Sequence, residues 1–523
     1  MMISSGTGAS SLSRRRMLQG TLACGAAAFA GGCYSAAADG NILRIRARAD
    51  IQTLDPAFRV TRADSDVIRC IFASLAMYQE DLEWGWTPFA AKSIAALDPT
   101  HVAFELNPGI MYSDGYGEVT AEDAKFSFER MINPAVKSPF AQDWGALDHV
   151  EVKDRYSGVI VLKTPFAPLW LSTLPTPSAV IMPKKALAAV GGTFTTQPPV
   201  TSGPYRIKSW EPKTKLVLAR NPDWKLTTPR FEEIHILPIE DDKTAELGFE
   251  SNAFDYTWTS VSSIPRYLKS VPKGARFARR PSLFYIWFGM NQDHPKLKNP
   301  LIRRAIQYAI DRKGVVDAAY FGAADPSTGI IPPGLPGHRE RNLYDRDLGK
   351  AMQLLKQANA RDLSLTLAVL NKAERLAAAQ IIQANLAEAN ITVEIQSYDT
   401  GTFWTLGAEK DGDSWKDLQL MINGFTLQPD PSWATAWFTS DKIGTWNWER
   451  FRNAEFDRLS EQGLAELDPL KRNAIYVKMQ DLMETSGDFV FLTHEPTGVL
   501  YSDKIAPALM PDGIPVMADF RKA

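Results

Sequence analysis

Cysteine is nearly absent from this 523-residue chain, which contains only Cys24, Cys33 and Cys70. The first two lie in a segment that we expect to be a removable export leader, so one thiol remains in the working protein. A single cysteine cannot form an intramolecular disulfide, even in an oxidising compartment. Cys70 falls in the apolar run at residues 67–72, and we predict a buried, unreactive thiol.

Recognisable catalytic and metal-binding motifs are also missing. The six histidines are dispersed with no pair at ligand spacing, and no C-x-x-C or H-E-x-x-H sequence occurs. No G-x-S-x-G nucleophile turn and no phosphate-binding glycine loop is present either. We therefore expect no metal, no cofactor and no enzymatic activity, although 60 acidic residues leave a catalytic carboxylate pair open.

An excess of positive charge is lacking as well. Three of the 58 lysines and arginines lie in the leader, so the rest of the chain has fewer basic residues than its 60 acidic ones. This charge balance does not indicate a nucleic-acid-binding surface. Beyond the leader, no apolar stretch reaches the roughly 20 residues that a membrane-spanning helix needs. The length instead predicts two or three domains, and 14 tryptophans with 34 prolines favour an aromatic-lined cleft on a loop-rich scaffold.

The first 38 residues have the pattern of an export signal. Arginines at 14–16 precede an uncharged stretch rich in alanine and glycine at 20–32, and small residues at 35–38 offer an A-x-A cleavage site. The order S-R-R-x-x-L, with Arg14 and Arg15, resembles a twin-arginine signal for exporting folded cargo. An ordinary secretory signal is the alternative, and both predict a periplasmic location.

The sequence offers two alternative processing sites for the leader. Cleavage after Ala38 releases a free protein, whereas Ala30-Gly31-Gly32-Cys33 partly resembles a lipoprotein box in which Cys33 is acylated and anchored. We favour cleavage after Ala38, because Ala30 is smaller than the aliphatic residue usual three positions before the cysteine.

Beyond the leader, periodicity and capping residues predict mixed helices and strands. Thr120, with an acid three residues later, is close to a capping box, and Asn299 opens a helix whose apolar stripe excludes Arg303 and Gln307. The expected strands cover residues 42–47, 102–106, 150–154, 157–163, 201–207, 215–220, 363–370 and 391–397, and the expected helices cover residues 68–77, 121–131, 301–310 and 374–388. This order predicts α/β lobes whose boundaries cross the chain several times.

A series of ordered segments carries a resemblance to a known family. The segments are Leu54-Asp55-Pro56, residues 71–75, residues 104–127 with Asp114-Gly115, Ser202-Gly203-Pro204-Tyr205, and residues 220–224, 290–312, 351–358 and 453–459. Together, over nearly the whole mature chain, they resemble family 5 extracellular solute-binding proteins, the peptide/nickel/opine class that serves ABC importers.

The resemblance implies an α/β fold, the two-lobed class II periplasmic binding protein of the large cluster, with an extra subdomain and a ligand cleft between the lobes. After a signal peptide at 1–38, the implied lobe I comprises 39–72, 200–282 and 495–523. The extra subdomain then covers 73–199, and lobe II covers 283–494. Pockets concentrate at domain interfaces, and periplasmic binders close around a ligand by hinge motion.

The resemblance also implies a function. The protein would be the periplasmic substrate-binding component of an ABC transporter, capturing a small peptide-like or opine-like solute by hinge closure and delivering it to the transmembrane permease subunits. We expect a monomer. The alternatives are a secreted hydrolase and a periplasmic peptide- or haem-binding chaperone with the same fold and a looser cleft.

The densest aromatic cluster lies late in the chain. Trp446-Asn447-Trp448 alternates aromatic and amide residues, which predicts both indoles on one face, stacking on a ligand while the amide fixes its orientation. The alternative for these residues is a hydrophobic core, since tryptophan is on average highly buried.

Other members of this cluster divide between cleft and core. Phe425 and Trp433 are further candidate ligand contacts, whereas the helix-like neighbours of Trp404 and Trp437 favour the core. Segments expected between the lobes add four candidates, each with a purely structural alternative. They are Thr53, Trp258, Tyr285 and Asn291.

One position departs from the peptide-binding members of the family. Those members carry an acid three residues before an acid–proline pair, and it neutralises the peptide's ammonium group. Here the pair is Asp430-Pro431 and the earlier position is Leu427, which cannot neutralise a buried ammonium. Asp430 is a candidate substitute, with a turn residue as the alternative. A zwitterionic, aromatic or sugar-like molecule, such as an opine-like conjugate, thereby becomes as strong a candidate as a peptide.

Overall fold

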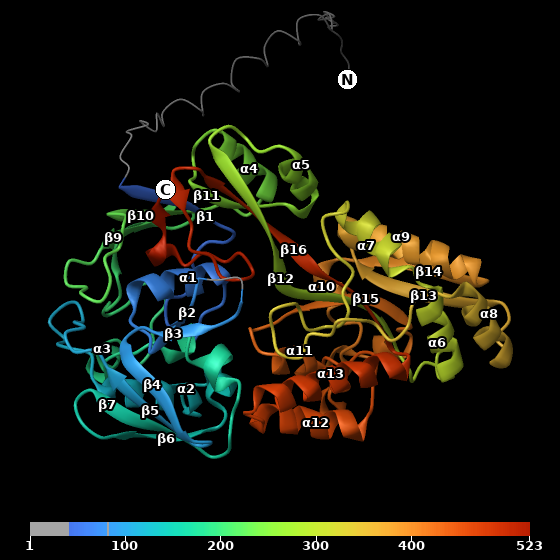
Figure 1. The fold of residues 1–523 in the computed structure, drawn as a ribbon, viewed down its shortest axis with the longest axis horizontal. Coiled ribbons are helices and arrows are strands. Elements are labelled where there is room, and N and C mark those ends of the chain that lie inside the picture. Colours follow the sequence, from blue (N-terminus) through green and yellow to red (C-terminus); the bar gives the residue numbers. More distant parts are fainter. Residues whose placement is uncertain (1–40, 81–82) are drawn as a thin grey trace, which may run out of the picture. The chain divides into compact units, whose positions relative to one another are not determined.

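A computed structural model describes residues 41–80 and 83–523, and residues 41–523 form one compact unit (Figure 1). The export leader, with Arg14, Arg15, Cys33 and the cleavage site after Ala38, lies outside the described residues. Within the described part, no helix is long and apolar enough to cross a membrane.

Ten strands of the described chain form one mixed sheet in the order β14-β13-β15-β12-β16-β11-β1-β10-β9-β8. Their bounds are β1 (Ile42–Ala47), β8 (Tyr205–Glu211), β9 (Lys215–Arg220), β10 (Glu233–Pro238), β11 (Tyr256–Thr259), β12 (Ala275–Met290), β13 (Leu363–Leu370), β14 (Ile391–Tyr398), β15 (Leu420–Thr426) and β16 (Phe489–Ser502). We call the part built on β1 and β8–β11 lobe I and the part built on β13–β15 lobe II. The strands β12 and β16 belong to both.

Lobe I begins with β1, which pairs in parallel with β10 and β11. The alternation of apolar and basic residues predicts a half-buried strand, and Leu43 and Ile45 are indeed buried. Arg46 differs from that pattern, because its side chain is fully buried and its guanidinium pairs with Asp242 at 2.6 Å. A paired and hydrogen-bonded arginine can be buried without leaving an isolated charge.

Helix α1 (Arg62–Ile71) begins and ends six residues earlier than the predicted helix at 68–77. That prediction is wrong beyond Ile71, since residues 76–78 form the short strand β2 (Ala76–Tyr78). The chain leaves the helix because the backbone amides of Ser202 and Gly203 both donate to the Ile71 carbonyl at 2.9 Å. A side chain at Gly203 would lie 2.6 Å from the backbone of α1, so only glycine permits this approach.

The extra subdomain is a four-stranded antiparallel sheet in the order β4-β5-β7-β6, with helices beside it (Figure 1). Helix α2 starts at a complete capping box between Thr120 and Asp123, which confirms the prediction there, and the predicted hairpin is β6 with β7. The bounds are β3 (Trp86–Pro88), β4 (Ala91–Asp98), β5 (His101–Leu106), β6 (Leu147–Val152), β7 (Ser157–Leu162), α2 (Ala121–Ile132) and α3 (Lys184–Ala189). Its hydrophobic core is continuous with that of lobe I.

Lobe II has a sheet covered on both faces. The predicted β-α-β unit is confirmed, with β13 and β14 parallel and α9 between them in sequence. Along β15 the side chains alternate, because Leu420 and Ile422 pack with one group of helices while Met421 and Phe425 face the other side. The helices are α6 (Pro300–Ala309), α7 (Arg312–Tyr320), α8 (Leu348–Gln357), α9 (Ala373–Glu388), α10 (Thr400–Phe403), α11 (Ser432–Thr435), α12 (Ala454–Ala465) and α13 (Pro469–Ser486).

Helix α6 confirms the predicted cap at Asn299 but corrects the predicted exposed face. Arg303 and Gln307 are buried rather than outside the apolar stripe. Arg303 lies 2.5 Å from the carboxylate of Asp488, and the Gln307 amide donates to the backbone carbonyls of Glu484 in α13 and Phe489 in β16. Helix α6 therefore packs on two sides, which a single amphipathic stripe does not reveal.

Strands β12 and β16 connect the lobes, and Figure 1 shows them side by side between the two parts of the sheet. Their pairing is irregular between Pro281 and Tyr285, beside the boundary expected at 282/283. Away from these strands, the Ala167 amide of the extra subdomain donates to the Leu464 carbonyl of α12 at 2.8 Å. Lobe I also carries α4 (Asp242–Glu250), α5 (Ile264–Lys269), β17 (Ile505–Ala506) and β18 (Arg521–Lys522).

Candidate functional site

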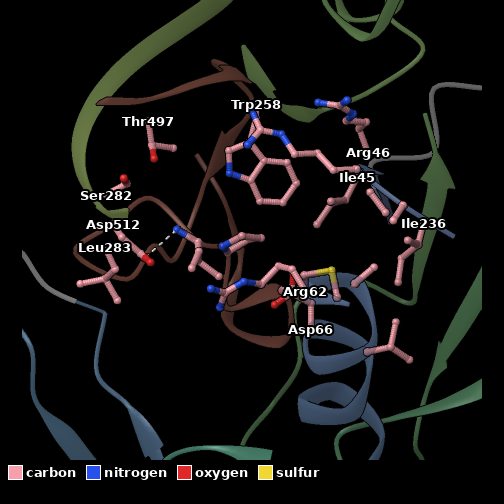
Figure 2. Close-up of a pocket in the computed structure, with 18 of the residues that line it drawn as sticks. Ile45, Arg46, Arg62, Asp66, Ile236, Trp258, Ser282, Leu283, Thr497 and Asp512 are labelled. Atoms are coloured by element: carbon pink, nitrogen blue, oxygen red, sulfur yellow. Dashed lines mark hydrogen bonds between the residues drawn. The ribbon is translucent and has the colours of Figure 1, made fainter. Parts of the chain in front are cut away.

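A cavity of about 220 Å³ lies where lobe I meets the hinge strands (Figure 2). β1, α1, β11 and the segment at residues 512–517 supply its lobe I wall. Leu283 and Phe284 in the middle of β12 and Thr426 at the end of β15 supply the opposite wall, where lobe II begins. A solute in this cavity would touch both lobes.

Trp258 forms an aromatic part of the wall, as expected from the sequence analysis. Its indole packs edge-on against Tyr256 with 5.4 Å between ring centroids, and it is 6% exposed. The Arg48 guanidinium lies above the indole at 5.5 Å from the ring centroid. The site therefore offers a flat hydrophobic surface with a cation beside it.

Two carboxylates line the same cavity from lobe I. Asp66 on α1 pairs with Arg69 at 2.9 Å, and Asp512 accepts a hydrogen bond from the Ile514 amide at 3.2 Å. Burial raises the pKa of Asp66 to about 6 and also raises the pKa of Asp512, because a charged carboxylate loses hydration there. Figure 2 shows both carboxylates at the cavity together with Arg62.

Arg62 is the available cation of the cavity. Its positive charge lowers the pKa values of Asp66 and Asp512, yet it forms no ion pair with any residue in the ranges 41–80 and 83–523. Arg46 is already engaged by Asp242 and by the carbonyls of Ile239 and Glu240. A ligand carboxylate could therefore pair with Arg62 directly, whereas pairing with Arg46 would require it to displace Asp242.

The late aromatic cluster forms a separate surface on lobe II. Phe425 is central, with ring centroids 5.6 Å from Trp437, 6.0 Å from Trp446 and 6.0 Å from Trp404. Trp433 packs on Trp437 at 6.0 Å. Trp446 is 43% exposed, and the other rings are half-buried, so this cluster is less buried than the core expected for Trp404 and Trp437.

Unlike Trp446, the side chains of Trp448 and Asn447 do not lie on that surface. Trp448 is 2% exposed and lies against Gly407, where an added side chain would be 2.2 Å from the indole. The Asn447 amide donates to the carbonyls of Phe438 and Phe451, and its oxygen accepts from the Phe451 amide. The expectation of both indoles on one face is wrong, because these residues form a tight turn rather than a strand.

Asp430 and three other candidates have structural partners. Asp430 is fully buried, pairs with Arg472 at 2.8 Å and caps the turn at Ser432. Tyr285 is buried and donates to the Ala434 carbonyl. The remaining two candidates donate hydrogen bonds to the backbone. The Asn291 amide donates to the Trp415 and Leu418 carbonyls, and the Thr53 hydroxyl donates to the Thr195 carbonyl.

Sequence reasoning missed the charged residues of the cavity. Asp66 lies on α1 and Asp512 in a turn near the C-terminus, and 446 positions separate them. A usable signal was the acid on an otherwise apolar helix face, since Val67, Cys70 and Ile71 around Asp66 are all buried. In the described residues, no group of three or more His, Cys, Asp or Glu could hold a metal ion.

The comparison with known proteins decides the family. The family described as bacterial extracellular solute-binding proteins, family 5 Middle, matches residues 86–446. The chain belongs to the family 5 solute-binding proteins. A curated relative, "Probable D,D-dipeptide-binding periplasmic protein DdpA" of Escherichia coli K12, is 27% identical over 471 residues, covering 87% of this chain and 89% of its own.

Solved structures show the family 5 fold. The substrate-binding protein CtaP of Listeria monocytogenes superposes with a TM-score of 0.80 at 20% identity, covering 92% of this chain and 99% of its own. AgaA from A. tumefaciens R10, solved with agropinic acid, gives a TM-score of 0.71 at 22% identity, with 92% and 99% covered. The predicted two-lobed α/β fold is thereby confirmed, as is the prediction of a family 5 solute-binding protein of ABC importers.

Proposed function

We propose that this family 5 protein captures a small peptide-like, opine-like or sugar-like solute in the cavity beside Trp258. It then delivers the solute to the transmembrane subunits of an ABC permease. The observation that carries the proposal is the cavity itself, which has walls from lobe I and from the parts of β12 and β15 where lobe II begins. A solute that contacts both walls stabilises the conformation in which the walls lie closer together. Binding therefore shifts the protein toward the closed conformation by hinge motion.

The chemistry of the walls favours a solute with a flat or ring-like body and charged ends. Trp258 offers a stacking surface, Arg62 offers a guanidinium for a carboxylate, and Asp66 and Asp512 offer negative charge. Phe425, Trp433 and Trp446 on lobe II stay proposed contacts for a larger solute. We do not extend this role to Asn447 or Trp448, whose side chains are engaged internally.

The leader and the domain division belong to the same proposal. We propose export to the periplasm by the twin-arginine route through Arg14 and Arg15, with cleavage after Ala38 and acylation at Cys33 as the alternative. The mature protein works as a monomer with lobe I at 39–72, 200–282 and 495–523, the extra subdomain at 73–199, and lobe II at 283–494.

Native mass spectrometry of freshly purified protein tests the function. We expect a small molecule to leave with the protein, and the same molecule, added back after removal, to raise the melting temperature and reduce the radius of gyration. A solute that binds without changing the scattering curve would contradict capture by hinge closure. Turnover of the solute would indicate the hydrolase, and broad weak binding of many ligands would indicate the chaperone.

A further inference from the structure

A second pocket, of about 350 Å³, lies where the C-terminal segment meets β12 and β16, and it shares no lining residue with the cavity beside Trp258. The first half of β12 supplies Arg276, Ala278 and Arg280, and β16 supplies Tyr501. The other walls are Glu80 and apolar residues of the C-terminal segment, among them Ile505, Pro507 and Leu509. The proposed solute capture makes no use of this pocket.

The order of residues along β12 creates the pocket. Side chains alternate between the two faces of a strand, so Arg276, Ala278 and Arg280 share one face. Tyr501 lies directly across from Arg276 in the antiparallel ladder, and its side chain shares that face. The small side chain of Ala278 leaves a gap between two long ones, whose Cα atoms are about 13 Å apart by strand geometry. Two guanidinium groups therefore flank one space.

Both arginines have unused capacity to bind an anion. Neither forms an ion pair with any residue in the ranges 41–80 and 83–523. The Nε atom of Arg280 is buried and has no hydrogen-bond partner among those residues, and its Nη1 atom reaches the Arg279 carbonyl only at 3.5 Å. A buried donor without a partner is costly, and in native structures a water or an ion commonly satisfies it.

Few acids surround the two arginines. No Asp or Glu occurs between Asp255 and Asp293, a stretch that includes all of β12. Among the described lining residues, Glu80 is the one acidic side chain, and it is paired with Arg521. The carboxylate of Ala523, which also lines the pocket, forms no ion pair with either arginine in the described structure. An anion in the pocket would therefore meet two guanidinium groups that no lining side chain already pairs with.

We propose that Arg276 and Arg280 bind a phosphate-bearing anion in this pocket, with a preference for two phosphate groups over one. Guanidinium groups bind phosphate oxygens through paired N–H donors, which suits arginine to this ligand. Two arginines on either side of Ala278 match two phosphates. A soluble diphosphate compound and the neighbouring headgroups of an anionic phospholipid surface share this chemistry. The site lies outside the solute cavity, so the proposal does not depend on solute capture.

Calorimetry on the exported protein tests the site with diphosphate and inorganic phosphate. Sodium chloride keeps the ionic strength constant, because salt screens contacts between exposed charges. Binding is measured directly, since phosphate raises the melting temperature of many proteins through exclusion from their surface. We expect diphosphate to bind at least tenfold more tightly than inorganic phosphate.

The double variant Arg276→Gln/Arg280→Gln should bind diphosphate at least tenfold more weakly, because glutamine donates hydrogen bonds but carries no charge. Arg341→Gln/Arg361→Gln is the matched control, with the same change in net charge. Both control residues are exposed, line neither pocket and form no ion pair with any described residue. The control should bind diphosphate as tightly as the unmodified protein, and melting temperatures verify that both variants fold.

Vesicles distinguish the two sources of phosphate. Flotation compares vesicles of phosphatidylcholine alone with vesicles that also contain phosphatidylglycerol. Retention on the anionic vesicles that Arg276→Gln/Arg280→Gln loses would identify lipid headgroups, whereas diphosphate binding without retention would identify a soluble anion.

The absence of both diphosphate binding and vesicle retention would overturn the site. So would unchanged binding in Arg276→Gln/Arg280→Gln, or an equal loss in the control variant. Equal affinities for diphosphate and inorganic phosphate would overturn the joint action of the two arginines.

Discussion

The guanidinium of Arg48 lies 5.5 Å from the ring centroid of Trp258, and both side chains line the cavity between the lobes. Arg48 is also held by Asp242, whose carboxylate lies 3.3 Å from its Nε. The indole and the guanidinium are thus positioned before any solute arrives, which lowers the entropy lost on binding.

Replacing Trp258 should weaken solute binding. Trp258→Phe keeps a flat ring but has less stacking area and a weaker cation–π contact, so we expect about 1 kcal/mol of lost affinity, measured by calorimetry with the co-purified solute. Trp258→Ala should lose more affinity and should also lower the melting temperature, because the residue is 6% exposed and packs against Tyr256. Equal affinities for all three proteins would contradict a role for the indole.

Trp446 and Trp448 should respond differently to truncation. Trp448→Ala removes a buried indole and should reduce the free energy of unfolding by about 3–5 kcal/mol. Trp446→Ala removes a ring that is 43% exposed and should change it by about 1 kcal/mol or less. Denaturant unfolding of the two variants measures the difference. A similar loss in both would show that Trp446 is also a core residue.

Simple peptides should bind poorly. Leu427 supplies no charge to a peptide ammonium on the lobe II side, and an unpaired buried ammonium is costly. We expect plain di- and tripeptides to bind with dissociation constants above about 1 μM, which corresponds to less than about 8 kcal/mol of binding free energy. Calorimetry with a dipeptide panel measures this, and sub-micromolar binding would refute the argument from Leu427.

Glu449 should make the stability of lobe II depend on pH. It is fully buried, accepts a hydrogen bond from the Trp287 indole at 2.7 Å, and its pKa is raised by burial to about 8. The folded protein therefore holds this proton to a higher pH than the unfolded chain. Between about pH 4.5 and pH 8, the unfolded chain binds fewer protons, so the free energy of unfolding falls as pH rises.

Glu449→Gln tests this pH dependence, because glutamine can still accept from Trp287 but does not ionise. Denaturant unfolding across the window should give a shallower fall for the variant, with a difference in slope of up to about 1.4 kcal/mol per pH unit. Burial also raises the pKa of Asp488, to about 7, and that contribution stays in both proteins. Parallel curves would indicate that Glu449 is charged in the folded state.

Export should depend on the paired arginines. Changing Arg14 and Arg15 together to lysine preserves the charge but removes the receptor-read pair. We expect the precursor of this double variant to accumulate in the cytoplasm, as measured by fractionation and immunoblotting. Normal periplasmic accumulation would favour the ordinary secretory signal instead.

Local signals predicted the fold well because they are encoded within a few residues. Thr120 and Asn299 cap their helices as expected, and the β-α-β unit of lobe II follows from its apolar periodicity. The errors arose where distant chain segments determine burial. Arg303 is buried by Asp488 and the backbone before β16, and α1 ends early because Gly203 approaches Ile71.

The candidate site was less predictable for the same reason. Of the expected contacts, Trp258 lines the cavity, whereas Asn447 and Trp448 are engaged within a turn. The acids Asp66 and Asp512 meet only after β1, α1 and the C-terminal segment assemble. Near Asp512 nothing in the sequence distinguishes the residue from an ordinary surface acid, whereas Asp66 is marked only by the apolar helix face around it.

The two strands shared by the lobes also determine how this protein can move. Because β12 and β16 are hydrogen-bonded to each other on both sides of the irregularity between Pro281 and Tyr285, the lobes are not joined by a free tether. Relative rotation must be absorbed as torsion of a paired ribbon. Such a connection gives one preferred axis of motion and an elastic return, and within residues 41–80 and 83–523 the lobes are joined by paired strands instead of an extended loop.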